Sequence, residues 1–260
     1  MSKLPPRDRL LELVKTVAVA AGSRLLDHGS GDEKLYRHTQ ENSKEIKARA
    51  DAILDKEILG ELLLTGLPIL SEESGLIRGG AESGMRFIVD PLDGTYNFVK
   101  KLGPSAVSIA LWDENTPVFG VIYRLDTREL TWGGPGFGTY TEGVPLTVSD
   151  TTIPALGSLC TGFPARCDLS SNEAMLNFWR LIARFGKVRM LGSAAVSLLQ
   201  VASGAAEAYS EKNIMLWDVA AGLALVAGAG GDFSFTAGTI DHSLDVYASN
   251  GRLTVGDALA

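Results

Sequence analysis

The hydrophobic pattern changes its period near the middle of the chain, and this change most constrains the fold. Four short strand-like runs follow one another between Met85 and Trp132, separated by turns that contain glycine or aspartate. Such a succession is typical of an antiparallel meander. After Asp150, strand-like and helix-like segments alternate with short connections, which indicates an α/β half. We therefore predict an α+β half, residues 1–148, followed by an α/β half, residues 149–260.

The segment before the meander predicts two helices. Apolar residues recur on one helical face from Leu10 to Leu25, and a second amphipathic pattern runs from about Asp51 to Leu64. The polar stretch Asp32–Arg49 has few apolar side chains to bury, so we expect a mobile loop or a ragged hairpin that acts as a lid. An ordered hairpin at a subunit interface is the alternative.

Composition argues against several classes of partner. The 260 residues include 24 basic and 31 acidic side chains, for a formal net charge of −7, so no broad surface for nucleic acid or an anionic membrane is expected. A small phosphorylated ligand is compatible with this charge, because a bound metal ion reverses the local field. The N-terminal segment lacks the features of a signal peptide, and the apolar run at 219–231 is too short to span a bilayer. We therefore expect a cytoplasmic protein.

The cysteines, the histidines and the glycine-rich run give little information about function. Cys160 and Cys167 are too few for a disulfide framework, and the three histidines are not spaced as zinc ligands. The glycine-rich run at 133–138 lacks the last glycine of a dinucleotide loop, because Thr139 takes its place. This run therefore predicts a tight hairpin.

The densest group of candidate functional residues lies in the sequence I-V-D-P-L-D-G-T. Asp90 ends a strand-like run because the following proline cannot donate to a strand ladder, and Asp93 comes three positions later. The Leu92 carbonyl lies between the two carboxylates, and the amides of Gly94 and Thr95 are available to an anion at a helix start. Alone, the D-x-x-D spacing is better explained by a strand end followed by an aspartate N-cap.

Two further acidic positions favour a metal site. Glu72 follows a short strand-like segment, and Asp218 lies in L-W-D-V-A-A-G at the start of an otherwise apolar helix. A buried carboxylate is seldom left unpaired, yet no lysine or arginine lies between Lys212 and Arg252. If the four carboxylates converge, their repulsion requires cations. Because hard oxygen ligands suit Mg²⁺, the sequence predicts a magnesium site.

Five segments resemble the inositol monophosphatase-like family of Mg²⁺-dependent, lithium-sensitive phosphatases. They are, in chain order, P-I-L-S-E-E-S, V-D-P-L-D-G-T-Y-N-F, G-F-G-T-Y-T-E-G-V-P-L, L-G-S-A-A-V-S-L-L and W-D-V-A-A-G. The resemblance covers essentially the whole chain. It implies a layered α-β-α-β-α sandwich of the sugar-phosphatase type, with the active site between the two halves, and we also expect a homodimer.

The resemblance implies a metal ligand set. One Mg²⁺ would be bound by Glu72, Asp90 and the Leu92 carbonyl. A second would be bound by Asp90, Asp93 and Asp218, and Glu72 would help to hold a third. The other implied positions bind substrate, the phosphate through the amides of Gly94 and Thr95 and the alcohol portion through Asp93, Gly192, Ser193, Ala194, Glu211 and Asp218.

The water-activating corner is where the chain departs from the family pattern. The resemblance implies that Thr95, paired with Asp51 and helped by Glu72, orients and deprotonates the attacking water. The family's D-x-V-T-x-x-D, in a loop before its second helix, reads E-I-K-A-R-A-D here. Glu45 replaces the first acid and Ala48 the threonine, which leaves the third metal and the closure of this segment open.

These residues together predict a Mg²⁺-dependent phosphomonoesterase that acts on a small polyol or sugar phosphate by attack of metal-activated water. The run Tyr96-Asn97-Phe98 is similar to the inositol phosphatase branch of the family. Within the family, the alternatives are 3′(2′),5′-bisphosphate nucleotidase, fructose-1,6-bisphosphatase and histidinol-phosphate phosphatase. Outside it, they are a glycosidase that uses an acid pair and a catalytically silent binding protein on the same scaffold.

Overall fold

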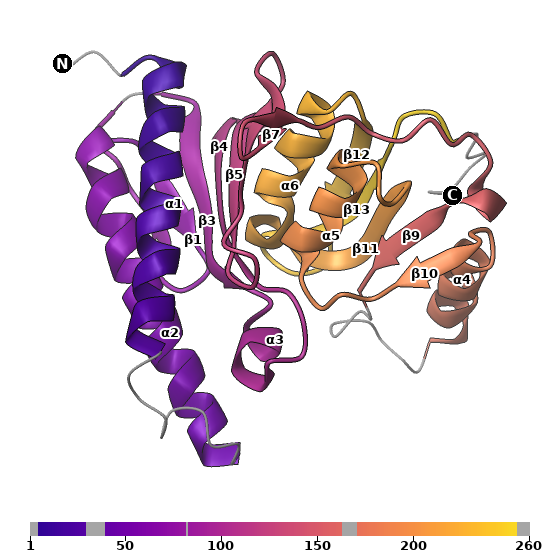
Figure 1. Ribbon diagram of the computed structural model, residues 1–260, viewed down its shortest axis with the longest axis horizontal. Helices are drawn as coiled ribbons and strands as arrows, with labels where there is room; N and C mark the ends of the chain where they lie inside the picture. Colours follow the sequence, from indigo (N-terminus) through magenta and orange to yellow (C-terminus); the bar gives the residue numbers. More distant parts are fainter. Residues whose placement is uncertain (1–4, 30–39, 82, 163–170, 254–260) are drawn as a thin grey trace.

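In the part of the chain that the structure describes, two β-sheets alternate with three layers of helices (Figure 1). The structure is a computed structural model that describes residues 5–29, 40–81, 83–162 and 171–253. Helices α1 (Arg7–Gly29) and α2 (Gln40–Leu62) cover one face of a large sheet. Helices α5 (Ala194–Ala202) and α6 (Leu216–Gly228) lie between the two sheets, and α4 (Asn172–Ile182) covers the outer face of the small sheet. The α-β-α-β-α sandwich is therefore confirmed.

The large sheet has, among the described residues, eight strands in the order β2-β1-β3-β4-β5-β6-β7-β8. The strands are β1 (Ile69–Ser71), β2 (Gly75–Ile77), β3 (Met85–Asp93), β4 (Ala106–Asp113), β5 (Thr116–Arg124), β6 (Leu130–Gly134), β7 (Gly138–Thr141) and β8 (Val144–Pro145). Strands β3 to β8 form the expected antiparallel meander, whereas β1 pairs with β3 in parallel. The glycine-rich run forms the β6–β7 hairpin, in which Gly134 pairs with Gly138.

The small sheet has, in the same described ranges, five strands in the order β10-β9-β11-β13-β12. Strand β9 pairs in parallel with β10 and β11, and β13 pairs antiparallel with β11 and β12. The strands are β9 (Ser158–Thr161), β10 (Lys187–Arg189), β11 (Ala208–Met215), β12 (Asp232–Ala237) and β13 (Ser243–Ser249). The remaining elements are the short helix α3 (Thr95–Lys100) and the 3₁₀ turns Leu63–Thr65 and Pro154–Leu156.

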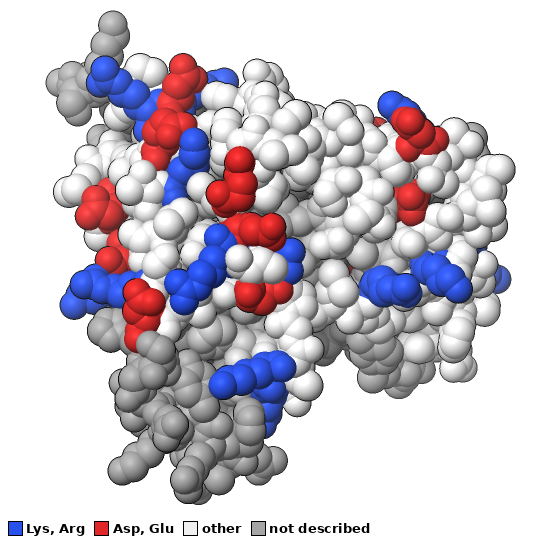
Figure 2. Space-filling model, in the orientation of Figure 1, with Lys and Arg blue, Asp and Glu red and all other residues white. Residues whose placement is uncertain are grey.

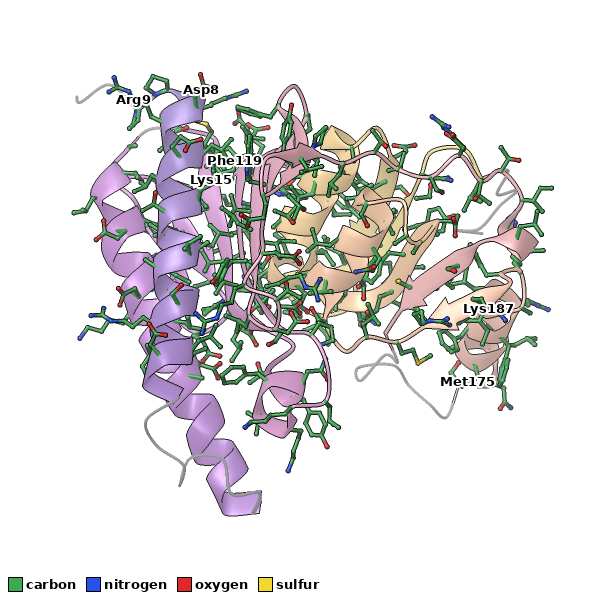
Figure 3. All side chains as sticks on the ribbon, viewed as in Figure 1. Asp8, Arg9, Lys15, Phe119, Met175 and Lys187 are labelled. Carbon is green, nitrogen blue, oxygen red and sulfur yellow. The ribbon has the colours of Figure 1, made fainter. Side chains whose placement is uncertain are left out.

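Both faces of the large sheet are buried over its central strands β3, β4 and β5. Phe119 packs toward α1 and α2 in the outer core (Figure 3). Ile88 and Trp112 face the middle core, where they join Leu198 of α5 and Leu223 of α6. Because both faces are covered, the strands are apolar over most of their length and do not alternate with polar residues. The middle core therefore contains side chains from both halves of the chain.

Helix α6 approaches the large sheet unusually closely. A Cβ on Gly120 of β5 would lie 2.2 Å from the carbonyl oxygen of Ala221, so only glycine fits there. Two side chains of the sheet also bond to the helix backbone: Trp112 Nε1 donates to the Ala220 carbonyl at 3.1 Å, and Thr139 Oγ1 donates to the Leu225 carbonyl at 2.7 Å. These contacts set the position of α6, whose first turn carries Asp218.

The expected loop or hairpin at Asp32–Arg49 is wrong for residues 40–49, which form the first part of α2. Residues 30–39 lie outside the described residues. Residues 40–49 include glutamate, lysine, alanine and arginine, which have a high propensity for helix. The segment can therefore be helical although it has no apolar face. It extends a helix whose packed end contains Leu54, Ile58 and Leu62, and adding residues to an existing helix costs little. In Figure 1 this end of α2 projects beyond the large sheet.

The surface carries both signs of charge. On the face shown in Figure 2, basic and acidic side chains are interspersed, mainly over the N-terminal helical layer. Lys15 of α1 lies against the sheet, with its ammonium 4.2 Å from the centre of the Trp132 ring (Figure 3). Among the described helices, none combines the length and the apolar composition needed to cross a membrane.

Candidate active site

Three carboxylates that are distant in sequence meet at one end of the large sheet. Glu72 directly follows β1, Asp90 lies in β3, and Asp218 lies in the first turn of α6. The parallel pairing of β1 and β3 brings the first two together, because the Glu72 amide donates to the Val89 carbonyl at 3.1 Å. One carboxylate oxygen from each of the three lies within 4.8 Å of the others. Such a set of oxygens suits a divalent cation.

The Asp55 carboxylate holds the segment that carries Glu72. It accepts hydrogen bonds from Ser71 Oγ at 2.7 Å and from Ser74 Oγ at 2.5 Å. Asp55 lies on the packed part of α2, so the two serines on either side of the glutamates are tied to the outer helical layer. The role of Asp55 could not be predicted from the sequence, since an aspartate inside a helix gives no local signal of a long-range contact.

The turn after Asp90 is set by its own side chain. Asp90 Oδ1 accepts a hydrogen bond from the Leu92 amide at 2.9 Å, and the pairing of β3 with β4 is irregular between Asp90 and Asp93. The Thr95 hydroxyl donates to the Leu92 carbonyl at 2.9 Å. The Leu92 carbonyl, expected to bind metal, and the Thr95 hydroxyl, expected to orient the water, are therefore in direct contact.

Asp93 joins the two halves of the chain. Its Oδ2 accepts hydrogen bonds from the Ser193 hydroxyl and, at 3.0 Å, from the Ala195 amide, while Oδ1 accepts from the Ala194 amide at 3.3 Å. A carboxylate is stabilised at a helix N-terminus, where free amides and the helix dipole point toward it. Asp93 thus holds the start of α5, next to the tight cluster of Glu72, Asp90 and Asp218.

Burial and mutual repulsion control the ionisation of the acidic residues. Burial, followed by the charges of Glu72, Asp93 and Asp218, raises the pKa of Asp90 well above its ordinary value. Burial and the neighbouring carboxylates likewise raise the pKa of Asp218. Burial raises the pKa of Asp93 to about 7, although the hydrogen bonds from Ser193 and α5 oppose this change. Such a cluster holds protons near neutral pH unless cations replace them.

The glycine after Asp93 allows the two halves to touch. Gly94 has a φ of 78°, and a Cβ there would lie 2.9 Å from the Pro104 carbonyl oxygen and 3.2 Å from that of Gly192. The buried Asn97 side chain closes this joint, since its amide donates to the carbonyls of Pro104 at 2.9 Å and Leu191 at 2.6 Å. The turn expected to bind phosphate thus contacts the segment expected to bind the alcohol. This role of Asn97 was not predicted from the sequence.

Glu211 lies on β11, and its carboxylate accepts a hydrogen bond from the Tyr209 hydroxyl at 2.9 Å. The pairing of β11 with β13 is irregular between Glu211 and Ile214, and Asn213 has a φ of 53°. Bulges of this kind re-aim side chains next to active sites. The bulge leads into α6, where Asp218 Oδ2 accepts from the Met215 amide at 3.3 Å. Tyr209 was missed by the sequence analysis, although its i, i+2 spacing puts it on the same strand face as Glu211.

Asp51 is buried within α2. Because α2 packs against α3, the element that carries Asp51 lies next to the helix that Thr95 begins. The departure from the family pattern at Glu45 and Ala48 therefore falls on a helix. The direct pairing of Asp51 with Thr95 stays a prediction.

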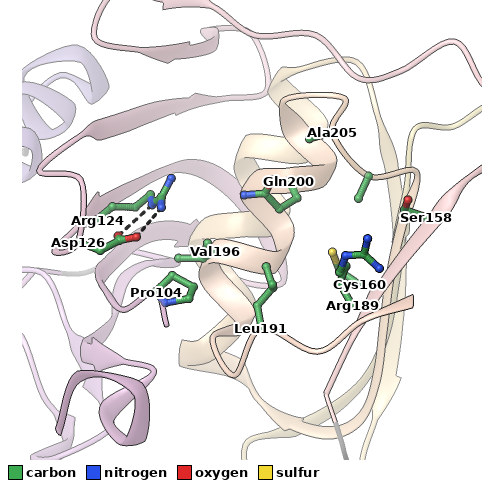
Figure 4. Close-up of a pocket in the computed structure, with 11 residues that line it drawn as sticks. Pro104, Arg124, Asp126, Ser158, Cys160, Arg189, Leu191, Val196, Gln200 and Ala205 are labelled. Atoms are coloured by element: carbon green, nitrogen blue, oxygen red, sulfur yellow. Dashed lines mark hydrogen bonds and ion pairs between the residues drawn. The ribbon is translucent and has the colours of Figure 1, made fainter. Parts of the chain in front are cut away.

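A separate cavity of about 340 Å³ lies beside the joint (Figure 4). Pro104 and Leu191, whose carbonyls accept from Asn97, line it together with Val196 of α5. Arg124 also lines it and pairs with Asp126 at 2.6 Å. None of the carboxylates expected to bind metal contributes to this cavity, so it is distinct from the acidic cluster.

Comparison with known proteins decides the family. A model of the inositol monophosphatase family matches residues 7–258. The chain belongs to the inositol monophosphatase family. Members of this family are metal-dependent phosphoric monoester hydrolases, so the chain is an enzyme of that class.

Three similar proteins illustrate the range of the family. A fructose-1,6-bisphosphatase/inositol-1-monophosphatase from Aquifex aeolicus is 29% identical over 248 residues, which cover 94% of this chain and 92% of that protein. A protein named Nus factor SuhB from Pasteurella multocida is 34% identical over 208 residues, covering 76% and 77%. The solved structure of an inositol monophosphatase from Anabaena (Nostoc) sp. PCC 7120 is similar with a TM-score of 0.76 and 31% identity, covering 94% of this chain and 92% of that chain.

Proposed function

We propose that this inositol monophosphatase family member is a Mg²⁺-dependent phosphomonoesterase that hydrolyses a small polyol or sugar phosphate, with an inositol monophosphate as the first candidate. The observation that carries the proposal is the convergence of oxygens from Glu72, Asp90 and Asp218 within 4.8 Å. It is supported by the names of the Aquifex and Anabaena relatives. The Aquifex name makes fructose 1,6-bisphosphate the second candidate.

The donor set fits Mg²⁺, because it consists of carboxylate and carbonyl oxygens whose repulsion a hard cation relieves. One ion would be held by Glu72, Asp90 and the Leu92 carbonyl. A second would be held by Asp90, Asp93 and Asp218, and Glu72 would help to hold a third. When bound, these ions stabilise the charge of the phosphate and provide a strongly nucleophilic water near neutral pH.

The protein's own groups orient the reactants. The Thr95 hydroxyl, beside the Leu92 carbonyl, would orient the attacking water together with Asp51, and Glu72 would take its proton. The amides of Gly94 and Thr95 would bind the phosphate. Asp93, Asp218 and Glu211 would hold the alcohol portion, together with Gly192, Ser193 and Ala194 at the N-terminal end of α5. As the water oxygen bonds to phosphorus, the P–O bond to the alcohol breaks and the leaving oxygen takes up a proton, so the products are the free alcohol and inorganic phosphate.

The sharpest test replaces Asp90 by asparagine. Asp90 is the only proposed side chain that would bind both ions, so Asp90→Asn is expected to lower kcat/KM by roughly 10³-fold or more, the range for losing a major electrostatic group. Phosphate release is measured over a Mg²⁺ titration with a panel of inositol phosphates, sugar phosphates, histidinol phosphate and 3′-phosphonucleotides.

The matched control for Asp90→Asn is Asp113→Asn, which changes a partly exposed carboxylate, paired with Arg7, at the far end of the β3–β4 pair. Its activity is expected to equal that of the wild type. Full activity of Asp90→Asn at saturating Mg²⁺ would remove the two-metal assignment.

We also propose a homodimer in the cytoplasm, with no partner other than the phosphorylated substrate, and no nucleic acid or membrane. Light scattering during size-exclusion chromatography measures the mass directly against the 27.6 kDa chain. A mass of a single chain at micromolar concentration would contradict the dimer.

A further inference from the structure

The phenol of Tyr209 takes no part in the mechanism above, yet it lies next to the acidic site. Its side chain is fully buried, at 0% exposure. Its hydroxyl donates to Glu211 Oε2 at 2.9 Å. Burial, followed by the charge of Glu211, raises the pKa of Tyr209, so the phenol stays protonated and keeps its role as donor. A buried hydrogen bond of this kind restricts the carboxylate to one orientation.

The backbone at Gly162 bounds the same carboxylate. A Cβ on Gly162 would lie 2.3 Å from both oxygens of Glu211, which is far inside van der Waals contact, so the glycine is needed for the carboxylate to lie where it does. Gly162 follows β9, and that end of β9 is tied to β11 because Thr161 Oγ1 donates to the Ser210 carbonyl at 2.6 Å. The Glu211 carboxylate is therefore confined by the Tyr209 hydroxyl and by the chain at Gly162.

The position of Glu211 is also linked to the metal side of the site. Glu211 directly precedes the irregular stretch of β11 that leads into α6, and the first turn of α6 carries Asp218. The bulge at Asn213 separates the two carboxylates along the chain, and it is held from outside, since the Asp245 carboxylate accepts from the Asn213 amide at 2.9 Å. Under the proposed function, a carboxylate fixed at this place would meet the alcohol portion of a substrate whose phosphate lies at the acidic cluster.

We propose that Tyr209 is a positioning residue that, with the backbone at Gly162, fixes the Glu211 carboxylate to accept a hydroxyl of the substrate. The pair thereby makes the enzyme prefer phosphates of polyols over phosphates of alcohols that carry no second hydroxyl. The inference rests on the proposed function, because it assumes that Glu211 contacts the alcohol portion.

The test compares Tyr209→Phe with the wild type on two substrates, inositol 1-phosphate and p-nitrophenyl phosphate, the second of which offers no hydroxyl to Glu211. Tyr209→Phe is expected to raise KM for the polyol phosphate by roughly three- to tenfold, the range for one hydrogen bond, with kcat within about twofold. KM for p-nitrophenyl phosphate is expected to stay unchanged. The matched control is Tyr247→Phe, which changes a tyrosine on the opposite face of the same sheet. It is expected to leave KM for both substrates unchanged.

Two further variants separate positioning from a general structural effect. Glu211→Gln is expected to raise KM for the polyol phosphate, and adding Tyr209→Phe to it should have no further effect, because the two residues act through one carboxylate. Gly162→Ala, which displaces the carboxylate from the other side, is expected to reproduce the substrate-selective increase. Thermal denaturation of each variant establishes that it is folded.

The outcomes distinguish the inference from the function on which it rests. Equal changes in KM for both substrates, or additive effects of Tyr209→Phe and Glu211→Gln, overturn the positioning role while Mg²⁺-dependent phosphate release by the wild type stands. A wild-type enzyme that releases no phosphate from any substrate overturns the proposed function and the inference with it. If Glu211→Gln leaves KM unchanged for every polyol phosphate, the alcohol contact is absent and the inference fails alone.

Discussion

Asp93 shows how one buried carboxylate couples the site to the stability of the protein. Its pKa is raised from 3.8 to about 7 by burial, so the folded state favours the protonated form. The free energy of unfolding is therefore not reduced by Asp93 below about pH 4, where this residue is protonated in both the folded and the unfolded chain. As the pH rises to about 7, the unfolded chain loses this proton more readily than the folded one, and the free energy of unfolding falls. The loss is on the order of a few kcal/mol in the metal-free protein, at about 1.4 kcal/mol per pKa unit.

Mg²⁺ binding requires the ionised carboxylates and should therefore reverse this loss. We expect the increase in Tm caused by Mg²⁺, relative to EDTA, to be larger at pH 7.5 than at pH 5. Thermal denaturation at both pH values measures it, with Asp90→Asn as a variant that should lose most of the increase. An increase of equal size at both pH values would contradict the assignment of these carboxylates to the metal.

Helix α6 is the element on which the site depends most. It packs between the two sheets and carries Asp218 in its first turn, so a shift along its length would move a carboxylate that we propose as a metal ligand. Gly120 permits its contact with β5. Gly120→Ala is expected to destabilise the protein by about 1–3 kcal/mol, because the added methyl group overpacks a rigid backbone contact.

Gly60 provides the opposite case for the same substitution. It lies exposed in α2, and a Cβ there would meet nothing within 4 Å, so Gly60→Ala is expected to stabilise the protein by about 0.5–1 kcal/mol through helix propensity. Urea denaturation of both variants measures the change in the free energy of unfolding, which is expected to be a decrease for Gly120→Ala and an increase for Gly60→Ala. A Gly120→Ala variant as stable as the wild type would mean that α6 does not approach β5 this closely in solution.

At the scale of the whole molecule, the large and small sheets share one middle core. Ile88 and Trp112 from the first half pack with Leu198 and Leu223 from the second, so neither half buries its apolar face alone. We predict that the sheets unfold together, with the slowest amides of β4 and β11 opening within about 1 kcal/mol of each other.

Hydrogen exchange followed by mass spectrometry or NMR measures these opening free energies. Helix α4 serves as the internal control, because it has no buried residue and lies on the outside of the small sheet, so it should open at lower free energy. A β11 that opens well below β4 would instead indicate that the halves 1–148 and 149–260 are separate folding units. Until then the boundary stays a prediction.

The local features of the site can be predicted from the amino-acid sequence alone. The D-P-L-D-G-T turn places Asp90, Leu92 and Thr95 within one chain reversal, so their proximity followed from a contiguous motif, and the change of hydrophobic period predicted the meander and the α/β half. Helix formation by residues 40–49 was missed because it depends on propensity and on the packed end of α2, and leaves no apolar pattern.

Contacts between residues that are distant in sequence depend on how the layers pack. The Asp55–Ser71 bond joins residues 16 apart, the Asn97–Leu191 bond joins residues 94 apart, and the Gly162 backbone meets Glu211 across two neighbouring strands. No single residue in these pairs signals its partner, because a buried asparagine, serine or carboxylate has many possible ways to satisfy its hydrogen bonds. The packing of the layers decides which of these possible partners come within hydrogen-bond distance.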